Sequence, residues 1–150
     1  MTIDKQEKKI DILLIEDNPG DIKLICEAFK EGPIYNNLTI VGDGEKALSF
    51  LHKEGVYQNC LHPDLILLDL NMPRKDGREV LAKIKADPKL KHIPVVILTS
   101  SEAEQDIRNA YNLQANCYIT KPADVTQFFN VVKLIQDFWL KIVKLPKNHD

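Results

Sequence analysis

The stretch Asp64-Leu65-Ile66-Leu67-Leu68-Asp69 is a short apolar run between two aspartates. Its apolar residues are continuous rather than alternating with polar ones, which is typical of a β-strand that is covered on both faces. Comparable runs lie on either side of it along the chain. Together they predict strands at residues 10–15, 38–41, 65–68 and 93–98, and a weaker fifth strand at residues 117–119.

Between these runs, apolar residues recur at the three- and four-residue spacing of amphipathic helices. The stripes contain Ile22, Ile25, Cys26 and Phe29; Ala47, Leu48 and Leu51; Val80, Leu81 and Ile84; Ile107, Ala110 and Tyr111; and Phe128, Val131, Val132, Ile135, Phe138, Trp139 and Ile142. The alternation predicts an α/β fold, in which five helices cover both faces of a five-stranded parallel sheet. In such sheets, ligands bind beyond the carboxyl ends of the strands.

The bulk composition excludes several classes of protein. A length of 150 residues favours one domain, and a formal net charge of −2 offers no basic surface for nucleic acid or an anionic membrane. No apolar stretch approaches the ~20 residues that cross a bilayer. Residues 1–9 are polar and charged, so we expect a flexible arm rather than a signal peptide, and residues 146–150 form a polar tail.

The cysteines do not indicate a metal or disulfide framework. Cys26, Cys60 and Cys117 are odd in number and lack the paired spacing of such sites. We expect buried thiols in a reducing compartment, with the cytoplasm as the default location.

The residues that follow the predicted strands carry functional side chains. Glu16-Asp17 follows the first strand and Asp69 the third, so we expect three carboxylates to meet at one edge of the sheet. Their repulsion raises the pKa of at least one of them and favours a bound divalent cation, and Mg²⁺ suits one or two carboxylates with several waters. Asp17 and Asp69 are the expected direct ligands, with Glu16 acting through water. The backbone carbonyl of Asn71 is suited to supply another oxygen.

Two further strand ends carry a hydroxyl and an ammonium group, Thr99 and Lys121. Taken singly, each residue has an ordinary role: Asp17 or Thr99 as a helix cap, Lys121 as a solvated surface lysine. Together they suit phosphoryl transfer, which needs mainly positioning and charge stabilisation. Asp69 is the expected nucleophile because it follows a central strand, and Lys121 and the Thr99 hydroxyl would contact phosphoryl oxygens.

Four motifs resemble the receiver domain of two-component response regulators. They are Leu13-Leu14-Ile15-Glu16-Asp17-Asn18, Leu67-Leu68-Asp69-Leu70-Asn71-Met72-Pro73-Arg74-Lys75-Asp76-Gly77, Val95-Val96-Ile97-Leu98-Thr99-Ser100 and Tyr118-Ile119-Thr120-Lys121-Pro122. The resemblance implies a flavodoxin-like (CheY-like), doubly wound sheet of strand order 2-1-3-4-5. It extends over about residues 10–140, and we expect a receiver domain at residues 10–145 with no output domain. It also implies that Asp69 accepts a phosphoryl group from a histidine kinase with Mg²⁺, as a switch limited to self-phosphotransfer and self-dephosphorylation, and not an enzyme.

The resemblance also carries over a switch mechanism. Thr99 would move toward the phosphoryl group, and Tyr118 would rotate inward behind it. The Lys121–Pro122 peptide bond is expected to be cis, a conformation that costs little before proline. Two features depart from the family pattern: the first acid is Glu16 rather than the commoner Asp, and the loop at residues 55–63 is long.

A narrower resemblance is to the small response regulators of cyanobacterial phytochromes. It rests on the long loop and on the motifs Gly77-Arg78-Glu79-Val80-Leu81, Asn116-Cys117-Tyr118-Ile119-Thr120-Lys121, Phe138-Trp139-Leu140 and Leu145-Pro146. It implies a light-sensing phytochrome kinase as phosphoryl donor. The output would be a protein contact, such as relay to a histidine phosphotransfer protein.

The last predicted helix carries more aromatic residues than one buried stripe needs. We expect a homodimer through the fourth and fifth helices and the fifth strand, as in similar regulators, with Tyr118, Phe128, Phe138 and Trp139 on its surface. Simple core packing is the alternative explanation for these aromatic side chains.

Three alternative functions agree less well with the sequence. A phosphatase of the haloacid dehalogenase type would use Asp69 as nucleophile, but it needs a second Asp as general acid where this chain has Asn71. A flavin or dinucleotide carrier would need a Gly-rich motif after the first strand, which is missing. A receiver-like interaction module that works without phosphorylation would not need the full acid set, Thr99 and Lys121.

Overall fold

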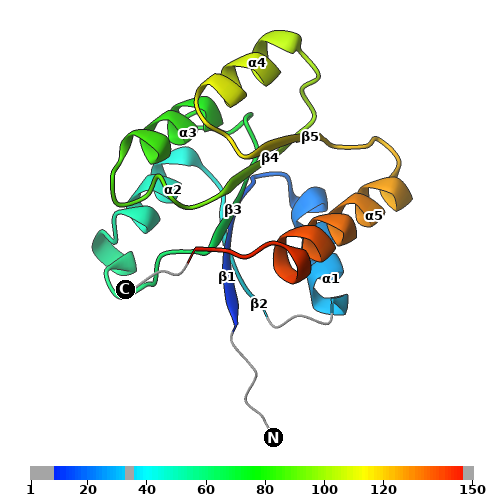
Figure 1. Ribbon diagram of the computed structural model, residues 1–150, viewed down its shortest axis with the longest axis horizontal. Helices are drawn as coiled ribbons and strands as arrows, with labels where there is room; N and C mark the ends of the chain where they lie inside the picture. The colour runs from blue at the N-terminus through cyan, green and yellow to red at the C-terminus, as the bar shows by residue number, and fades with distance from the viewer. Residues whose placement is uncertain (1–8, 33–35, 147–150) are drawn as a thin grey trace, which may run out of the picture.

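The computed structural model describes residues 9–32 and 36–146, and every structural statement below concerns these residues. They form a parallel sheet with helices on both faces (Figure 1), which confirms the expected α/β class. The strands are β1 (Ile10–Ile15), β2 (Asn36–Val41), β3 (Leu65–Leu68), β4 (Val95–Thr99) and β5 (Cys117–Thr120). The α-helices are α1 (Pro19–Glu31), α2 (Gly44–Leu51), α3 (Gly77–Ala86), α4 (Glu104–Asn112) and α5 (Val125–Gln136).

The order of the strands determines where a ligand can bind. The five-stranded sheet has the order β2-β1-β3-β4-β5, as the resemblance implied, and each neighbouring pair is parallel. The chain passes from β1 outward to β2 and then returns to β3 on the other side of β1, so the topological switch point lies between β1 and β3. At that point Ile15 pairs with Leu68. The residues that follow, Glu16 and Asp69, therefore leave adjacent strands side by side.

Two apolar layers attach the helices to the sheet. α1 and α5 cover one face, and α2, α3 and α4 cover the other (Figure 1). Side chains alternate between the faces of a strand, so Leu65 and Leu67 pack with α1 and α5 while Ile66 and Leu68 pack with the other helices. Burial on both faces explains why the β3 sequence is apolar at every position.

α4 buries fewer residues than the other α-helices. In the α1–α5 layer, the buried side chain of Gln136 donates a hydrogen bond from Nε2 to the Ala28 carbonyl at 2.7 Å. In the opposite layer, α4 buries one side chain, Ala110. A buried hydrogen bond thus joins α1 to α5, whereas α4 rests on the sheet through a small contact.

Short polar motifs begin three of the helices. Asn18, Asp43 and Asp76 occupy the N-cap positions of α1, α2 and α3. Each side chain accepts a hydrogen bond from a backbone N–H of the following turn, which satisfies a donor that the helix cannot. These caps place the helix beginnings beside the carboxyl ends of the strands.

The predicted strands at residues 10–15 and 65–68 are confirmed, and other boundaries differ. β2 begins at Asn36, earlier than predicted. β4 begins at Val95 rather than at residue 93, since Pro94 has no N–H to donate to a strand ladder. The long loop contains a 3-10 turn, η2 (Gly55–Tyr57), and its Tyr57 ring packs edge-on against Phe50.

The apolar stripe at the end of the chain predicts one regular helix, and this prediction is wrong. α5 ends at Gln136, and the π-helical segment η3 (Asp137–Ile142) continues the chain. There the Val143 N–H donates to the Phe138 carbonyl, five residues back, at 2.9 Å. The wider winding leaves Phe138 and Ile142 50% and 69% exposed, although α-helical spacing from Ile135 would have buried both.

Some expectations concern parts of the chain outside this description. Residues 1–8 of the predicted arm and 147–150 of the predicted tail lie outside the described residues, so the domain limits at 10 and 145 stay predictions. No helix in the described part of the chain has the length and apolar character that crossing a bilayer requires.

Candidate functional site

Three carboxylates converge where β1 and β3 end. Glu16 and Asp17 follow β1, and Asp69 follows β3, where its N–H donates to the Ile15 carbonyl at 3.0 Å. One carboxylate oxygen from each residue lies within 4.8 Å of the others. Glu16 and Asp69 are buried and Asp17 is exposed, so the acidic cluster opens to solvent on one side.

Lys121 is the counter-ion of this cluster. Its Nζ lies 2.8 Å from Glu16 Oε1, 2.8 Å from Asp21 Oδ2 and 3.1 Å from Asp69 Oδ2. The Lys121 side chain is 8% exposed, so these are largely desolvated, charge-assisted contacts. One compact ammonium group thus joins residues from β1, α1 and β3 to the end of β5.

The charges of the site shift two pKa values. Burial is the largest influence on Glu16 and raises its pKa to about 7; the hydrogen bond from Lys121 opposes this, and the charge of Asp69 adds to it. For Lys121, burial lowers the pKa, but the hydrogen bonds to Asp21 and Glu16 outweigh burial and hold the pKa above its ordinary value. Lys121 therefore stays charged, and burial opposes the ionisation of Glu16.

Thr99 ends β4 with its hydroxyl inside the protein. The residue is fully buried, and its Oγ1 has no hydrogen-bond partner among the described residues. Its carbonyl accepts from the Lys121 N–H at 2.7 Å, so Thr99 and Lys121 are fixed on neighbouring strands. A buried hydroxyl without a hydrogen-bond partner destabilises the folded state, and a ligand that accepts its hydrogen bond removes this cost.

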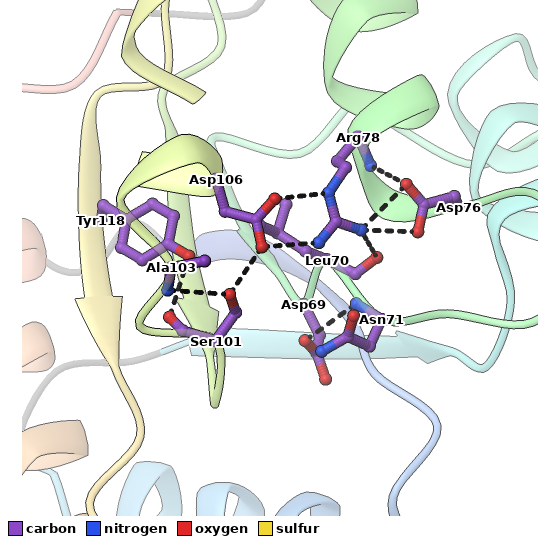
Figure 2. Close-up of polar contacts among 9 residues, drawn as sticks. All are labelled: Asp69, Leu70, Asn71, Asp76, Arg78, Ser101, Ala103, Asp106 and Tyr118. Atoms are coloured by element: carbon purple, nitrogen blue, oxygen red, sulfur yellow. Dashed lines mark hydrogen bonds and ion pairs between the residues drawn. The ribbon is translucent and has the colours of Figure 1, made fainter. Parts of the chain in front are cut away.

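The loop after β3 is shaped by a close approach of α3. Asp69 Oδ1 accepts from the Asn71 N–H at 3.2 Å (Figure 2). The Gly77 N–H donates to the Leu70 carbonyl at 2.9 Å. A Cβ atom at Gly77 would overlap the Asp69 carbonyl oxygen. Glycine is thus needed for the first residue of α3 to lie against the Asp69 backbone.

Tyr118 is joined to the loop that follows β4. Its hydroxyl donates to the Ser101 carbonyl at 3.0 Å (Figure 2). The residue is half-buried, and burial raises the pKa of its phenol, so the hydroxyl keeps its proton. Ser101 lies two residues after Thr99, which makes Tyr118 a neighbour of the expected switch.

The structure corrects two expectations about these residues. No peptide bond among residues 9–32 and 36–146 is cis, so the Lys121–Pro122 bond is trans, the form that X–Pro bonds prefer intrinsically. Phe128 does not belong to a dimer surface, because it is 5% exposed and packs against the sheet in the α1–α5 layer. Phe138 is half exposed, while Tyr118 and Trp139 are half-buried.

Sequence reasoning missed Asp21, which contacts Lys121 as closely as Glu16 does. The available signal was its position in the first turn of α1, where the helix begins beside the strand ends. An acid in that turn is also expected from the helix dipole, which concealed its second role.

The acidic cluster has the donor set of a divalent-metal site. Three carboxylates within one small volume, one of them exposed, suit a hard cation that keeps several waters. Lys121 neutralises only part of their charge. The residues Glu16, Asp17 and Asp69 are those that the sequence predicted for this role.

Comparison with known proteins identifies the family. The model of the family described as response regulator receiver domain matches residues 12–133. The chain belongs to this family. Response regulator Rcp1 of Synechocystis sp. (strain ATCC 27184 / PCC 6803 / Kazusa) is 50% identical over 135 residues, which are 90% of this chain and 92% of Rcp1.

Solved structures of response regulators agree closely with the fold. The phosphorylated cyanobacterial phytochrome response regulator RcpA is 51% identical with a TM-score of 0.91, covering 93% of this chain and 100% of RcpA. The Mn²⁺-bound form of Rcp1 is 48% identical with a TM-score of 0.91, covering 92% and 99%. The chain is thus a response regulator with a divalent-metal site, and the expectation that it is not an enzyme is confirmed by its relatives.

Proposed function

We propose that Asp69 is the phosphoacceptor of this response regulator. The observation that carries the proposal is the position of Lys121 Nζ, 3.1 Å from Asp69 Oδ2 on a buried side chain. The buried Thr99 hydroxyl, which lacks a partner among the described residues, offers a second donor for a phosphoryl oxygen. The oxygens of a phosphoryl group on Asp69 would accept hydrogen bonds from both the Lys121 ammonium group and the Thr99 hydroxyl.

The transfer itself asks little chemistry of the protein. An Asp69 carboxylate oxygen attacks the phosphorus of a phosphohistidine, the P–N bond breaks, and an acyl phosphate forms on Asp69. Lys121 stabilises the charge on one phosphoryl oxygen and the Thr99 hydroxyl donates to another. Asn71, whose N–H donates to Asp69 Oδ1, keeps the carboxylate oriented.

We propose Mg²⁺ as the metal of the site. Asp17 and Asp69 would be direct ligands, with Glu16 acting through water and the Asn71 backbone carbonyl supplying a further oxygen. When bound, the cation offsets negative charge on the incoming phosphoryl group. Exposure of Asp17 leaves room for the waters that Mg²⁺ retains.

The proposed donor is a histidine kinase of the phytochrome type. Support comes from RcpA, which is described as a cyanobacterial phytochrome response regulator and is 51% identical to this chain. The proposed type of kinase rests on this likeness. Downstream, we propose a protein contact in the cytoplasm, with a histidine phosphotransfer protein as one candidate.

A homodimer through α4, β5 and α5 remains part of the proposal. Phe138 and Ile142 of η3 are exposed, and Leu134 and Val125 of α5 are 64% and 66% exposed. These exposed apolar side chains are ones that a second copy could cover. Phe128 plays no part in this surface.

Neither alternative function is favoured by a specific observation. Membership of the receiver family and the Asn in place of a second Asp at position 71 argue against a haloacid-dehalogenase-like phosphatase. The intact set of Glu16, Asp17, Asp69, Thr99 and Lys121 argues against a module that works without phosphorylation.

The direct test is labelling of Asp69. With Mg²⁺ and a small phosphodonor such as acetyl phosphate, wild type should gain one phosphoryl group, detected by intact-protein mass spectrometry. Asp69→Asn should gain none. Asp137→Asn, the same change at an exposed site on η3, should be labelled as wild type is. Labelling of Asp69→Asn at the wild-type level would show that another residue accepts the group.

A further inference from the structure

An ion pair joins the segment after Asp69 to the loop that follows Thr99. Arg78, in the first turn of α3, contacts Asp106 in the first turn of α4 through two hydrogen bonds (Figure 2). Nε lies 3.0 Å from Oδ1, and Nη2 lies 2.8 Å from Oδ2. This two-point geometry matches the planar guanidinium to the carboxylate and fixes their relative orientation.

On the α3 side, the guanidinium is tied to the backbone next to Asp69. Arg78 Nη1 lies 2.9 Å from Asp76 Oδ1 and 3.5 Å from the Leu70 carbonyl. The same Leu70 carbonyl accepts from the Gly77 N–H at 2.9 Å. Arg78 is thereby fixed to the residue that directly follows the proposed phosphoacceptor.

On the α4 side, the carboxylate is tied to the loop after Thr99. Asp106 Oδ2 accepts from the Ser101 hydroxyl at 2.6 Å, and the Ser101 carbonyl accepts from Tyr118 at 3.0 Å. The hydrogen bonds therefore run in one chain from Leu70 through Arg78, Asp106 and Ser101 to Tyr118 (Figure 2).

This pair differs from an ordinary surface ion pair. The side chains of Arg78 and Asp106 are 36% and 18% exposed, and both are also held by other groups. The hydrogen bonds from Arg78 and Ser101 hold the pKa of Asp106 below its ordinary value, and those to Asp106 and Asp76 hold the pKa of Arg78 above its own. Both groups stay charged across the physiological range, so the contact persists there.

We propose that Arg78 and Asp106 are positioning residues for the phosphoryl site. By clamping the two loops together, they hold the Thr99 hydroxyl in its buried place without a partner, ready for a phosphoryl oxygen. Loss of either residue lets the loop after β4 relax away from this arrangement, since nothing else described joins Ser101 to α3. The inference rests on the proposed role of Asp69 and goes beyond it, because neither residue contacts the phosphoryl group.

Beryllofluoride, a non-transferable phosphoryl mimic, provides the test in the full-length protein with Mg²⁺. Arg78→Gln and Asp106→Asn should each weaken beryllofluoride binding by about 5- to 20-fold, the range of ordinary coupling between sites. Mg²⁺ affinity without the mimic should change less than about 2-fold, because the carboxylate ligands lie outside the ion pair. The double variant should lose no more than either single one.

The two substitutions change the net charge in opposite directions, which separates positioning from long-range electrostatics. A field effect alone would make Arg78→Gln weaken binding of the anionic mimic and Asp106→Asn strengthen it. Positioning makes both weaken it. Arg108→Gln and Glu104→Gln, the same charge changes at exposed sites of α4, are the matched controls and should stay near wild type.

A second readout protects the test against a simple loss of folding. Arg78→Lys keeps the charge but not the two-point contact. Its binding of beryllofluoride should therefore lie between that of wild type and that of Arg78→Gln. Amide hydrogen exchange should accelerate at residues 100–104 in Arg78→Gln, while β1 and β3 exchange as in wild type. Uniform acceleration over the sheet would overturn the positioning role in favour of a general structural one.

The outcomes also separate this inference from the proposed function. Wild-type binding of the mimic with unchanged binding by Arg78→Gln and Asp106→Asn overturns the positioning role alone. Failure of wild type to bind, or equal binding by Asp69→Asn, overturns the proposed function and the positioning role together. Similar losses of beryllofluoride affinity in Arg78→Gln and Asp106→Asn, with Mg²⁺ affinity unchanged, support the positioning role.

Discussion

Lys121 Nζ lies 2.8 Å from Glu16 Oε1, although 105 residues separate the two in sequence. Glu16 is almost wholly buried, and Lys121 is the cation that it contacts. A buried charge is tolerated only when it is paired, so this contact supports the metal-free state of the site. It also means that Lys121 serves the fold before any phosphoryl group arrives.

Lys121→Met should therefore destabilise the metal-free protein by about 3–5 kcal/mol, the cost of leaving a buried partner charge unpaired. Mg²⁺ should recover part of that loss by taking over as counter-ion. Urea unfolding with chelator and with Mg²⁺ measures both effects. Lys133→Met, at an exposed pair with Glu31 3.7 Å away, should cost less than about 1 kcal/mol. Equal losses in the two variants would contradict the pairing argument.

The stability of the metal-free protein should fall as pH rises from 4.5 to about 7. In this window the folded state keeps a proton on Glu16, whose pKa is raised to about 7, while the unfolded chain has released it at its ordinary value of 4.5. More protons bound in the folded state means that stability decreases with pH, here by about 1–3 kcal/mol in total, and levels off above the folded pKa. Urea unfolding in chelator at pH 5 and pH 8 measures the difference. Glu16→Gln should remove that contribution; an unchanged pH profile in this variant would assign it to other groups.

Thr99→Val should separate stability from phosphoryl binding. Since Oγ1 has no partner among the described residues, replacing it by a methyl group should leave the unfolding free energy within about 1 kcal/mol of wild type or raise it. Beryllofluoride binding should weaken, because a donor to the phosphoryl group is gone. Isothermal titration alongside urea unfolding gives both quantities. A large loss of stability would show that the hydroxyl is already satisfied.

Gly77→Ala should damage the site through the backbone. The added Cβ would overlap the Asp69 carbonyl, so α3 or the Asp69 loop must shift, at a cost of about 1–3 kcal/mol. Phosphoryl labelling should fall with it. In Gly20→Ala, the added Cβ meets nothing closer than 3.4 Å, and helix propensity should make this control neutral or slightly stabilising. Wild-type labelling of Gly77→Ala would mean that the loop adapts.

Phe128 and Phe138 should behave as opposites. Phe128→Ala removes a buried ring and should cost about 3–5 kcal/mol. Phe138→Ala, at a half-exposed ring, should cost less than about 1 kcal/mol but weaken any homodimer through the α4–β5–α5 surface. Sedimentation velocity at tens of micromolar, with and without phosphorylation, measures association. A wild type that stays monomeric in both states would remove the dimer from the proposal.

Much of this site was predictable because strand ends in a parallel sheet share one edge. Continuous apolar runs indicated the strands, and the residues just after them gave Glu16, Asp17, Asp69, Thr99 and Lys121 without knowledge of distances. That rule applies to residues adjacent to strands. It does not reach Asp21, which lies in a helix, and the spacing of 28 residues between Arg78 and Asp106 carries no periodic signal.

Other differences arise where helical periodicity misleads. A stripe of apolar residues does not reveal a change from α to π winding. Helical spacing therefore predicts that Phe138 lies on the same face as Ile135. Nor does it separate a buried aromatic ring from an exposed one, and Phe128 was placed on a contact surface for that reason. Both are decided by tertiary packing, which local spacing does not encode.

The helices on the two faces of the sheet are attached in different ways. On one face, the buried Gln136–Ala28 hydrogen bond joins α5 to α1. α4 buries one side chain, Ala110, and the Arg78–Asp106 ion pair joins its first turn to α3. We expect a phosphoryl group on Asp69 to act first on the α4 side of the sheet, through the Thr99 hydroxyl and this ion pair, which would give the signal a direction in space.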